Sequence, residues 1–200
     1  MPSEAFQKLD ENKKNKIIDA MKKEFGRTAF DKTSVERIVK DAGISKGSFW
    51  VYFENKSEAI DYIIDLYMKN EYMIFKNKLI NNKGDLFSTA REMYEYLVKN
   101  NDARLLMGNI IQVLMTSQER EIAEYKEKGT EELKSFFEII DTSNINKKYQ
   151  EKKYILTLIK MMTQSIRSNA LAVILNKCPE KDASENLERE LTILKNGICS

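Results

Sequence analysis

The chain contains no histidine, and among its 200 residues there are only two prolines, seven glycines and two cysteines. Without histidine, the Ser-His and Cys-His nucleophile systems are excluded, as are zinc sites that need imidazole ligands. Cys178 and Cys199 lie late in the sequence and far apart, without CxxC spacing. We expect both to be reduced thiols, with a disulfide between them as the alternative. No cofactor or metal is expected.

Long apolar runs are also missing. No run approaches the roughly 18 residues that a membrane-spanning helix needs, and the first residues lack the apolar core of a secretory signal. The sequence therefore predicts a cytoplasmic protein with no membrane partner. The formal net charge is only +2, so a nucleic-acid-binding function must rest on where the charges lie and not on their sum.

What the sequence does contain favours helices. Hydrophobic residues make up 42% of the chain and charged residues 32%, and many of them are Leu, Ile, Met, Lys and Glu, which are helix formers or tolerated in helices. Because few residues break helices, we expect an all-α protein of about nine helices. The expected helices cover about 9–27, a short segment between Thr33 and Gly43, 45–51, 56–80, 86–100, 102–116, 118–140, 148–176 and 183–197.

Polar residues that can cap helices mark several of the expected starts. Thr33 with Glu36 has the spacing of a capping box, in which each side chain bonds a free backbone N–H of the first turn. Ser45 is the expected N-cap of the next helix. Asn55 with Glu58 repeats the capping spacing before the long helix that follows.

The segment GISKGSFWVYFENK, residues 43–56, combines glycine, serine and lysine with four aromatic rings. Two short helices joined by a glycine-containing turn form a helix-turn-helix, whose second helix enters the DNA major groove. The first turn of that helix is small and basic, so backbone can approach DNA closely. Trp50 and Tyr52 carry an N–H or O–H that can donate to phosphate, and Lys56 adds a cation at the next helix start.

Here the chain resembles the DNA-binding domain of the TetR family of bacterial transcriptional regulators, over residues 17–63. The residues that match the family pattern are Phe25, Phe30, Thr33-Ser34-Val35, Ile38, Gly43-Ile44-Ser45, Lys46-Gly47-Ser48-Phe49-Trp50-Val51-Tyr52-Phe53 and Lys56. The chain departs from the pattern at four positions. These are Ala29 for glycine, Val39 for alanine, Trp50 for the tyrosine that contacts phosphate, and Ile60 for leucine.

The resemblance implies a helix-turn-helix DNA-binding domain over residues 1–55 and an effector-binding and dimerisation domain over residues 56–200. The expected partners are a double-stranded DNA operator, a small-molecule effector and a second copy of the chain. The candidates for reading bases are Lys46, Gly47 and Ser48. The candidates for binding phosphate are Thr33, Ser34, Ser45, Trp50, Tyr52 and Lys56.

Effector and dimer contacts are expected in the larger domain. Methionine and aromatic residues on the helices that surround the family's effector site suit an adaptable apolar cavity, but equally an ordinary core. The effector candidates are Tyr72, Met107, Ile111, Met115, Tyr125, Phe137, Met162, Gln164 and Arg167. Apolar stripes on the last two helices could form half of an intermolecular four-helix bundle, or could face their own core. The dimer candidates are Ile155, Leu158, Ile159, Ile166, Ala170, Val173, Leu187, Leu191 and Leu194.

The expected function is thus a ligand-responsive DNA-binding transcriptional regulator that is not an enzyme. As a repressor it would bind a near-palindromic operator as a dimer and leave it when an effector binds. One alternative is a helical small-molecule-binding dimer without functional DNA readout. Another is a helical enzyme with paired carboxylates, but no acidic pair in the sequence forms a recognisable acid–base or metal motif.

Overall fold

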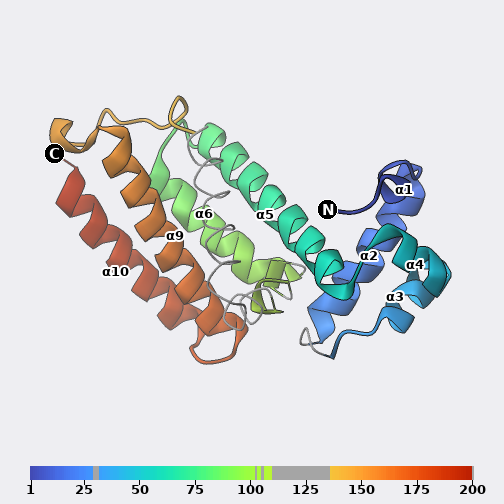
Figure 1. Cartoon of the computed structure of the whole chain (residues 1–200). Coiled ribbons are helices and arrows are strands. Elements are labelled where there is room, and N and C mark those ends of the chain that lie inside the picture. Colours follow the sequence, from blue (N-terminus) through green and yellow to red (C-terminus); the bar gives the residue numbers. More distant parts are fainter. Residues whose placement is uncertain (29–31, 102, 105, 110–135, 200) are drawn as a thin grey trace. The chain divides into compact units, whose positions relative to one another are not determined.

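The computed structural model of the chain describes residues 1–28, 32–101, 103–104, 106–109 and 136–199. Within these residues the named elements are all helical (Figure 1), which confirms the expected all-α class. They are α1 (Glu4–Gln7), α2 (Glu11–Arg27), α3 (Val35–Ala42), α4 (Lys46–Tyr52), α5 (Lys56–Asn81), α6 (Leu86–Lys99), the 3₁₀ turn η2 (Lys147–Tyr149), α9 (Lys152–Ile174) and α10 (Glu180–Ile198). None of the helices in the described ranges is long and apolar enough to cross a bilayer.

Packing divides the chain into two compact units. The N-terminal unit comprises residues 1–69 and 105–117, and the C-terminal unit comprises residues 70–104 and 118–200. Helix α5 therefore begins in the N-terminal unit and ends in the C-terminal one. The functional boundary after residue 55 stays a prediction, and each unit is described separately below.

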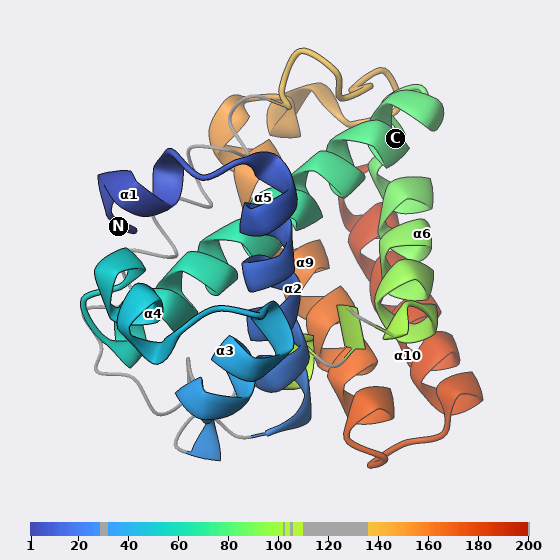
Figure 2. The same ribbon diagram turned by 90° about the vertical axis from the view of Figure 1, so that its right-hand side faces the viewer.

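The core of the N-terminal unit forms between α2, α3 and α4 (Figure 2). Ile17 and Met21 from α2, Ile38 from α3 and Phe49 from α4 are completely buried. The buried apolar residues of a helix recur three or four positions apart, so each helix turns one apolar face inward. Gly43, with φ +68°, ends α3 in the left-handed conformation that glycine adopts without strain, as the sequence predicts.

Helix α1 was not predicted, because the first residues of the chain are mostly polar and the first helix was expected from about residue 9. It exists because Ser3 caps it and because Phe6, only 2% exposed, inserts among three aromatic rings. The centroid of Phe6 lies 5.1 Å from that of Phe53, 5.8 Å from Tyr52 and 5.4 Å from Tyr62. Edge-on and tilted ring pairs at such separations are favourable beyond the area they bury. The first helix is thereby fixed to α4 and the start of α5.

Of the three predicted helix caps, the one at the start of α3 differs from expectation. Its N-cap is Ser34 and not Thr33: the Ser34 Oγ accepts from the backbone N–H of Arg37 at 3.3 Å. Thr33 is instead buried, and its hydroxyl oxygen has no hydrogen-bond partner. The shift of one residue means that the predicted capping box is wrong, because Thr33 points into the core.

The other predicted caps are confirmed. Ser45 Oγ accepts from the N–H of Ser48 at 3.0 Å at the start of α4. Asn55 Oδ1 accepts from the N–H of Glu58 at 2.9 Å, and a Glu58 oxygen accepts from the N–H of Glu54, the residue before the cap, at 2.6 Å. Together these bonds fix where α5 begins.

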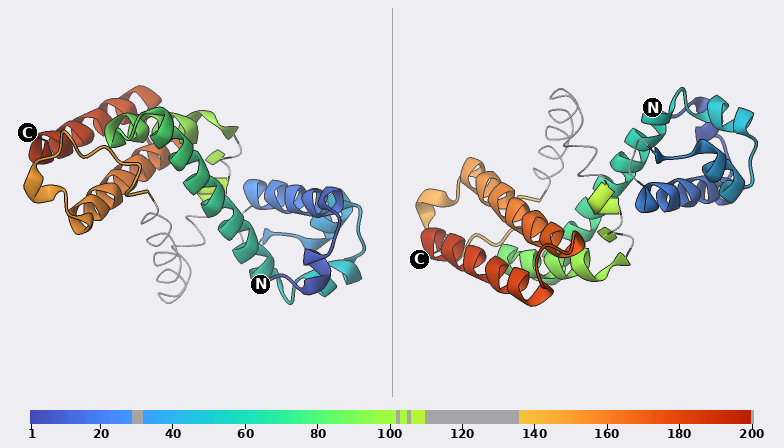
Figure 3. Two further views of the ribbon diagram at one scale, coloured as in Figure 1. Left: turned by 90° about the horizontal axis from the view of Figure 1, so that it is seen from above. Right: turned by 90° about the horizontal axis from the view of Figure 1, so that it is seen from below.

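In the C-terminal unit, α6 and α10 both pack against α9, and α9 and α10 run side by side in opposite directions (Figures 1 and 3). The expected helix over 148–176 begins only at Lys152, because residues 147–149 form η2 instead. The last helix begins earlier than predicted, at Glu180. Gly84, with φ +86°, precedes α6, and its carbonyl accepts from the N–H of Asp141 at 3.0 Å.

A buried polar contact fixes α10 against α9. Asn169 on α9 is 6% exposed, yet its amide is satisfied on both sides. Its Oδ1 accepts from Asn186 Nδ2 at 2.9 Å, and its Nδ2 donates to a Glu190 oxygen at 3.0 Å. Because an unpaired buried amide is costly, these bonds favour one register of the two helices over others.

Candidate DNA-binding site and effector site

The residues that were predicted to contact DNA bases lie on helix α4, next to the turn that precedes it. Lys46 and Gly47 are exposed at the N-terminal turn, Ser48 is half-buried behind them, and Ser45 is exposed as their cap. A Cβ added to Gly47 would meet only the Ser45 Oγ, at 3.8 Å. Packing within the chain therefore does not require glycine here.

Trp50 is 41% exposed on the same helix, with its ring edge-on to buried Phe49 at a centroid separation of 5.0 Å. One side of the indole thus rests on the core and the other faces solvent. Tyr52 lies differently from the expectation. Its side chain is 8% exposed and packs against Phe6, so its ring is part of the aromatic core, and a contact of its hydroxyl with phosphate stays a prediction. The sequence missed this because α1, which covers it, was itself not predicted.

The remaining phosphate candidates lie around the start of α3. Ser34 is half-buried at the helix cap. The Lys56 ammonium group lies 3.4 Å from the carbonyl oxygen of Thr33, to which it donates. Burial of the Thr33 side chain, at 7% exposure, removes it from the surface. The predicted set is therefore corrected at Thr33, whose hydroxyl is buried.

An acidic side chain lies beside the candidate reading residues and was not anticipated. Lys46 Nζ donates to a Glu36 oxygen at 2.5 Å, and the Ser34 hydroxyl donates to the other oxygen at 3.1 Å. The bond from Lys46 is the largest influence that lowers the pKa of Glu36, to about 2, so this carboxylate is ionised at neutral pH.

A second unanticipated carboxylate joins α2 to α3. Glu24 is 1% exposed and accepts hydrogen bonds from Arg37, from Arg27 and from the backbone N–H of Ser34. Burial by itself would raise the pKa of Glu24. The bonds from Arg37, Ser34 and Arg27 outweigh that effect and lower the pKa to about 2. A glutamate in the middle of an apolar helical face was the available sequence signal.

The effector candidates are only partly brought together. Ile111, Met115 and Tyr125 lie outside the described residues, and Met107 is buried in the N-terminal unit. In the C-terminal unit, Met162 is buried, Tyr72, Phe137 and Arg167 are half-buried, and Gln164 is exposed. Met162 lines a small cavity of about 10 Å³, whose other lining residues are Phe75, Leu86, Ala90, Ile159, Thr163 and Ile166.

The titratable residue Glu71, which was not among the predicted effector residues, lies near this cavity. Glu71 precedes Phe75 by one helical turn on α5, is 8% exposed, and its Oε1 has no hydrogen-bond partner. Burial raises the pKa of Glu71 to about 7, although the positive charge of Arg167 opposes the rise. The signal in the sequence was an acidic residue four positions from Tyr67 and from Phe75 on an otherwise apolar face.

The dimer candidates mostly face inward. Except for half-buried Leu194, all nine lie in the core of the C-terminal unit, so the apolar stripes serve their own protomer. Of the two alternatives left open for these stripes, the burial of their side chains supports packing against their own core. The exposed apolar side chains of α9 and α10 are others: Tyr154 at 40%, Met161 at 50% and Ile193 at 71% exposure.

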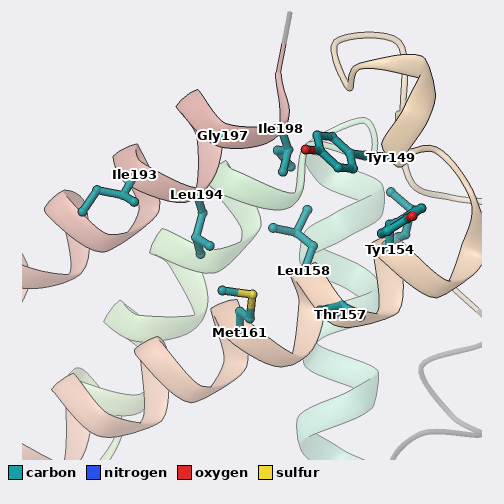
Figure 4. Close-up of a pocket in the computed structure, with 10 residues that line it drawn as sticks. Tyr149, Tyr154, Thr157, Leu158, Met161, Ile193, Leu194, Gly197 and Ile198 are labelled. Atoms are coloured by element: carbon teal, nitrogen blue, oxygen red, sulfur yellow. The ribbon is translucent and has the colours of Figure 1, made fainter.

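These exposed residues border an apolar groove of about 250 Å³ between the start of α9 and the end of α10 (Figure 4). Figure 4 shows Met161 and Leu158 on one wall and Leu194 and Ile198 on the other. Three of the predicted dimer residues, Ile155, Leu158 and Leu194, thus line the groove.

Comparison with known proteins supplies the family. The family model described as "Bacterial regulatory proteins, tetR family" matches residues 17–62, and the one described as "Tetracyclin repressor-like, C-terminal domain" matches residues 85–198. The first match covers the helix-turn-helix, and the second covers α6 to α10.

Two curated relatives come from Bacillus subtilis strain 168. The uncharacterised HTH-type transcriptional regulator YerO is 26% identical over 193 residues, which is 93% of this chain and 53% of YerO. The uncharacterised HTH-type transcriptional regulator YuxN is 30% identical over 95 residues, 45% of this chain and 32% of YuxN. The chain thus spans about half or less of the length of these relatives.

Solved structures share the fold. A TetR family transcriptional regulator from Chloroflexus aurantiacus is similar with a TM-score of 0.60 and 18% identity, over 100% of this chain and 99% of that one. SmeT, the repressor of the Stenotrophomonas maltophilia multidrug efflux pump SmeDEF, has a TM-score of 0.64 and 15% identity, over 98% and 93% of the two chains. At these identities the likeness is one of fold alone. With both family models matched in order along the sequence, the chain belongs to the TetR family of bacterial transcriptional regulators.

Proposed function

We propose that the protein is a ligand-responsive repressor that binds a near-palindromic DNA operator as a dimer and releases it when a small-molecule effector binds. The observation that carries this proposal is the N-terminal turn of α4. In a helix-turn-helix of a family of DNA-binding regulators, it presents an exposed lysine and a glycine with no packing role. Residues in this position of the second helix contact base edges.

Lys46 and Gly47 have separate roles in the proposed complex. The Lys46 ammonium group leaves Glu36 and donates to a base edge or a phosphate oxygen, both of which accept from lysine. Gly47 brings the helix backbone close to the groove because it has no side chain to hold it away. Trp50, exposed on the following turn, donates its indole N–H to a phosphate oxygen.

The test is selection of bound duplexes from a random pool, followed by affinity measurements on the selected sequence. We expect Lys46→Ala to weaken binding about tenfold to a hundredfold, the usual range for one base or phosphate contact. Gly47→Ala should also weaken binding while leaving stability unchanged or raised, since alanine favours helix. Lys99→Ala is the matched control, because Lys99 is an exposed lysine paired with Glu95 at 3.0 Å.

The outcomes separate this function from its alternative. Affinity for the selected duplex should fall steeply as salt rises, because binding releases counterions. If no duplex is selected and small molecules still bind, the protein is a helical ligand-binding dimer without DNA readout. Full affinity in Lys46→Ala would remove that lysine from the interface.

We propose that the second protomer of the dimer binds at the groove between α9 and α10. Three exposed apolar side chains around one groove are what a homodimer interface covers. Two-fold pairing would also place two copies of α4 on successive half-sites of a palindrome. We expect Ile193→Lys to produce monomers in sedimentation and to weaken operator binding. Ile80→Lys is the control, since Ile80 is 51% exposed on α5 and does not line the groove. An unchanged dimer in Ile193→Lys would refute this face.

A further inference from the structure

Glu71 is the least satisfied charged group in the described part of the C-terminal unit. Its side chain is 8% exposed, and Oε1 receives no hydrogen bond. Buried carboxylates are ordinarily paired or hydrogen-bonded, because leaving one without donors costs several kcal/mol. Folding alone gives no reason to keep a glutamate here, since leucine or methionine would fill the same space.

The charge that acts on Glu71 among the described residues is that of Arg167 on α9. Arg167 itself is half-buried. It attracts the carboxylate without a hydrogen bond to the free oxygen. Burial still dominates, and it raises the pKa of Glu71 to about 7. The Oε1 of Glu71 can therefore still accept a hydrogen bond from a positively charged partner.

Apolar side chains adjoin Glu71. Phe75 lies one turn further along α5, and it lines the small cavity with Met162 and Ile166. At about 10 Å³ this space is about one water molecule in size, so a larger molecule enters only if side chains repack. Methionine suits such repacking because it is unbranched and flexible. A ligand that places hydrocarbon among these residues would bring a polar end within reach of α5.

We propose that Glu71 is the recognition carboxylate of the effector site and that the effectors are lipophilic organic cations, such as aryl-alkyl amines. This inference rests on the proposed function and names the chemical class of its effector. The ammonium group donates to the unpartnered Glu71 oxygen, and the hydrocarbon part packs against Phe75 and Met162. A cationic ligand is favoured here because it supplies both the hydrogen-bond donor that the Glu71 Oε1 lacks and a positive charge to pair with the carboxylate.

The test compares two probes of matched shape and opposite charge, phenethylammonium and hydrocinnamate. Calorimetric titration of the wild-type protein should show at least about tenfold tighter binding of phenethylammonium. Glu71→Gln should reduce that binding about tenfold or more, since a hydrogen bond to a charged group contributes about 1.5–3 kcal/mol. Glu95→Gln, an exposed glutamate on α6 that is 61% accessible, is the matched control and should leave both affinities unchanged.

Three outcomes overturn the inference: equal or tighter binding of hydrocinnamate, an unchanged cation affinity in Glu71→Gln, and no binding of phenethylammonium at about 10 mM, where even weak complexes form. The two probes are compared on the wild-type protein alone, so this result does not depend on whether a variant folds. Duplex selection without any ligand tests the proposed function separately. A protein that binds DNA but shows no cation preference refutes the effector class and leaves the regulator intact.

Discussion

Replacing Glu24 by glutamine tests whether one buried carboxylate holds the helix-turn-helix together. The substitution keeps the shape of the side chain and removes its charge. Glu24 accepts from Arg37 Nη2 at 2.6 Å, from Arg27 Nη2 at 2.5 Å and from the Ser34 N–H at 2.9 Å. These bonds link the end of α2 to the first turn of α3. Without the charge they weaken together, and we expect the N-terminal unit to lose stability.

The magnitude follows from the pKa of Glu24, which is lowered from 4.5 to about 2 in the folded protein. That difference corresponds to about 3 kcal/mol at neutral pH. Because Arg27 and Arg37 are 41% and 47% exposed, solvent screens part of it, and we expect a loss of about 2 kcal/mol. Because the pKa of Glu24 is lower in the folded protein than in the unfolded chain, its ionised carboxylate stabilises the folded protein at pH values above 4.5. The contribution of the charge is lost as the pH falls from 4.5 toward 2.

Urea titration followed by Trp50 fluorescence measures this effect, because the only tryptophan lies in the N-terminal unit and contacts Phe49. The midpoint should fall in Glu24→Gln with an unchanged slope, and the difference from wild type should shrink below pH 4.5. Glu36→Gln is the control: that carboxylate is exposed, so solvent screens its ion pair with Lys46 and the urea midpoint should stay close to that of wild type. A midpoint equally close to wild type in Glu24→Gln at pH 7 would refute the reasoning, as would a difference that does not depend on pH.

Three further measurements follow from particular residues. Gly84→Ala should destabilise the C-terminal unit by at least about 2 kcal/mol, because φ is +86° and a Cβ would overlap the backbone of Ile139 and Asp141; a melting temperature equal to wild type would contradict this. Glu71→Gln should be more stable than wild type at pH 8, by up to about 3 kcal/mol, and no more stable at pH 4.5. The folded-state pKa of about 7 exceeds the ordinary 4.5, so wild-type stability declines as pH rises between them; a gain that does not depend on pH would exclude ionisation as its cause. Trp50 emission should change when the selected duplex binds, and unaltered emission in a verified complex would remove Trp50 from the DNA surface.

The sequence alone determined the elements that depend on local chemistry. The caps at Ser45 and Asn55 and the left-handed turn at Gly43 were predictable because each needs only residues a few positions apart. The helix-turn-helix resemblance followed from the fixed spacing of residues 43–56. Low glycine and proline content was enough to indicate an all-α chain.

Tertiary structure decided what each side chain of those elements faces. Tyr52 was predicted at the surface but is buried, because Phe6 from an unpredicted helix covers it. Helical periodicity identified Ile159 and Leu191 as apolar contact residues, yet it cannot distinguish a protomer's own core from a partner's surface. Ile193, by contrast, is exposed, and it is the residue that we propose to contact a second copy.

The two buried carboxylates show the same limit most clearly. In the sequence, Glu24 and Glu71 are alike: each is an acidic residue within a helix otherwise rich in apolar positions. Folding brings Arg37 from α3 to Glu24 and leaves the Oε1 of Glu71 without a donor. The pKa of one falls to about 2 and that of the other rises to about 7, because ionisation depends on what distant segments bring into contact. The sequence specified that both residues are acidic, and only the packing of other helices around them gave Glu24 its hydrogen bonds to α3 and left the Oε1 of Glu71 without a donor.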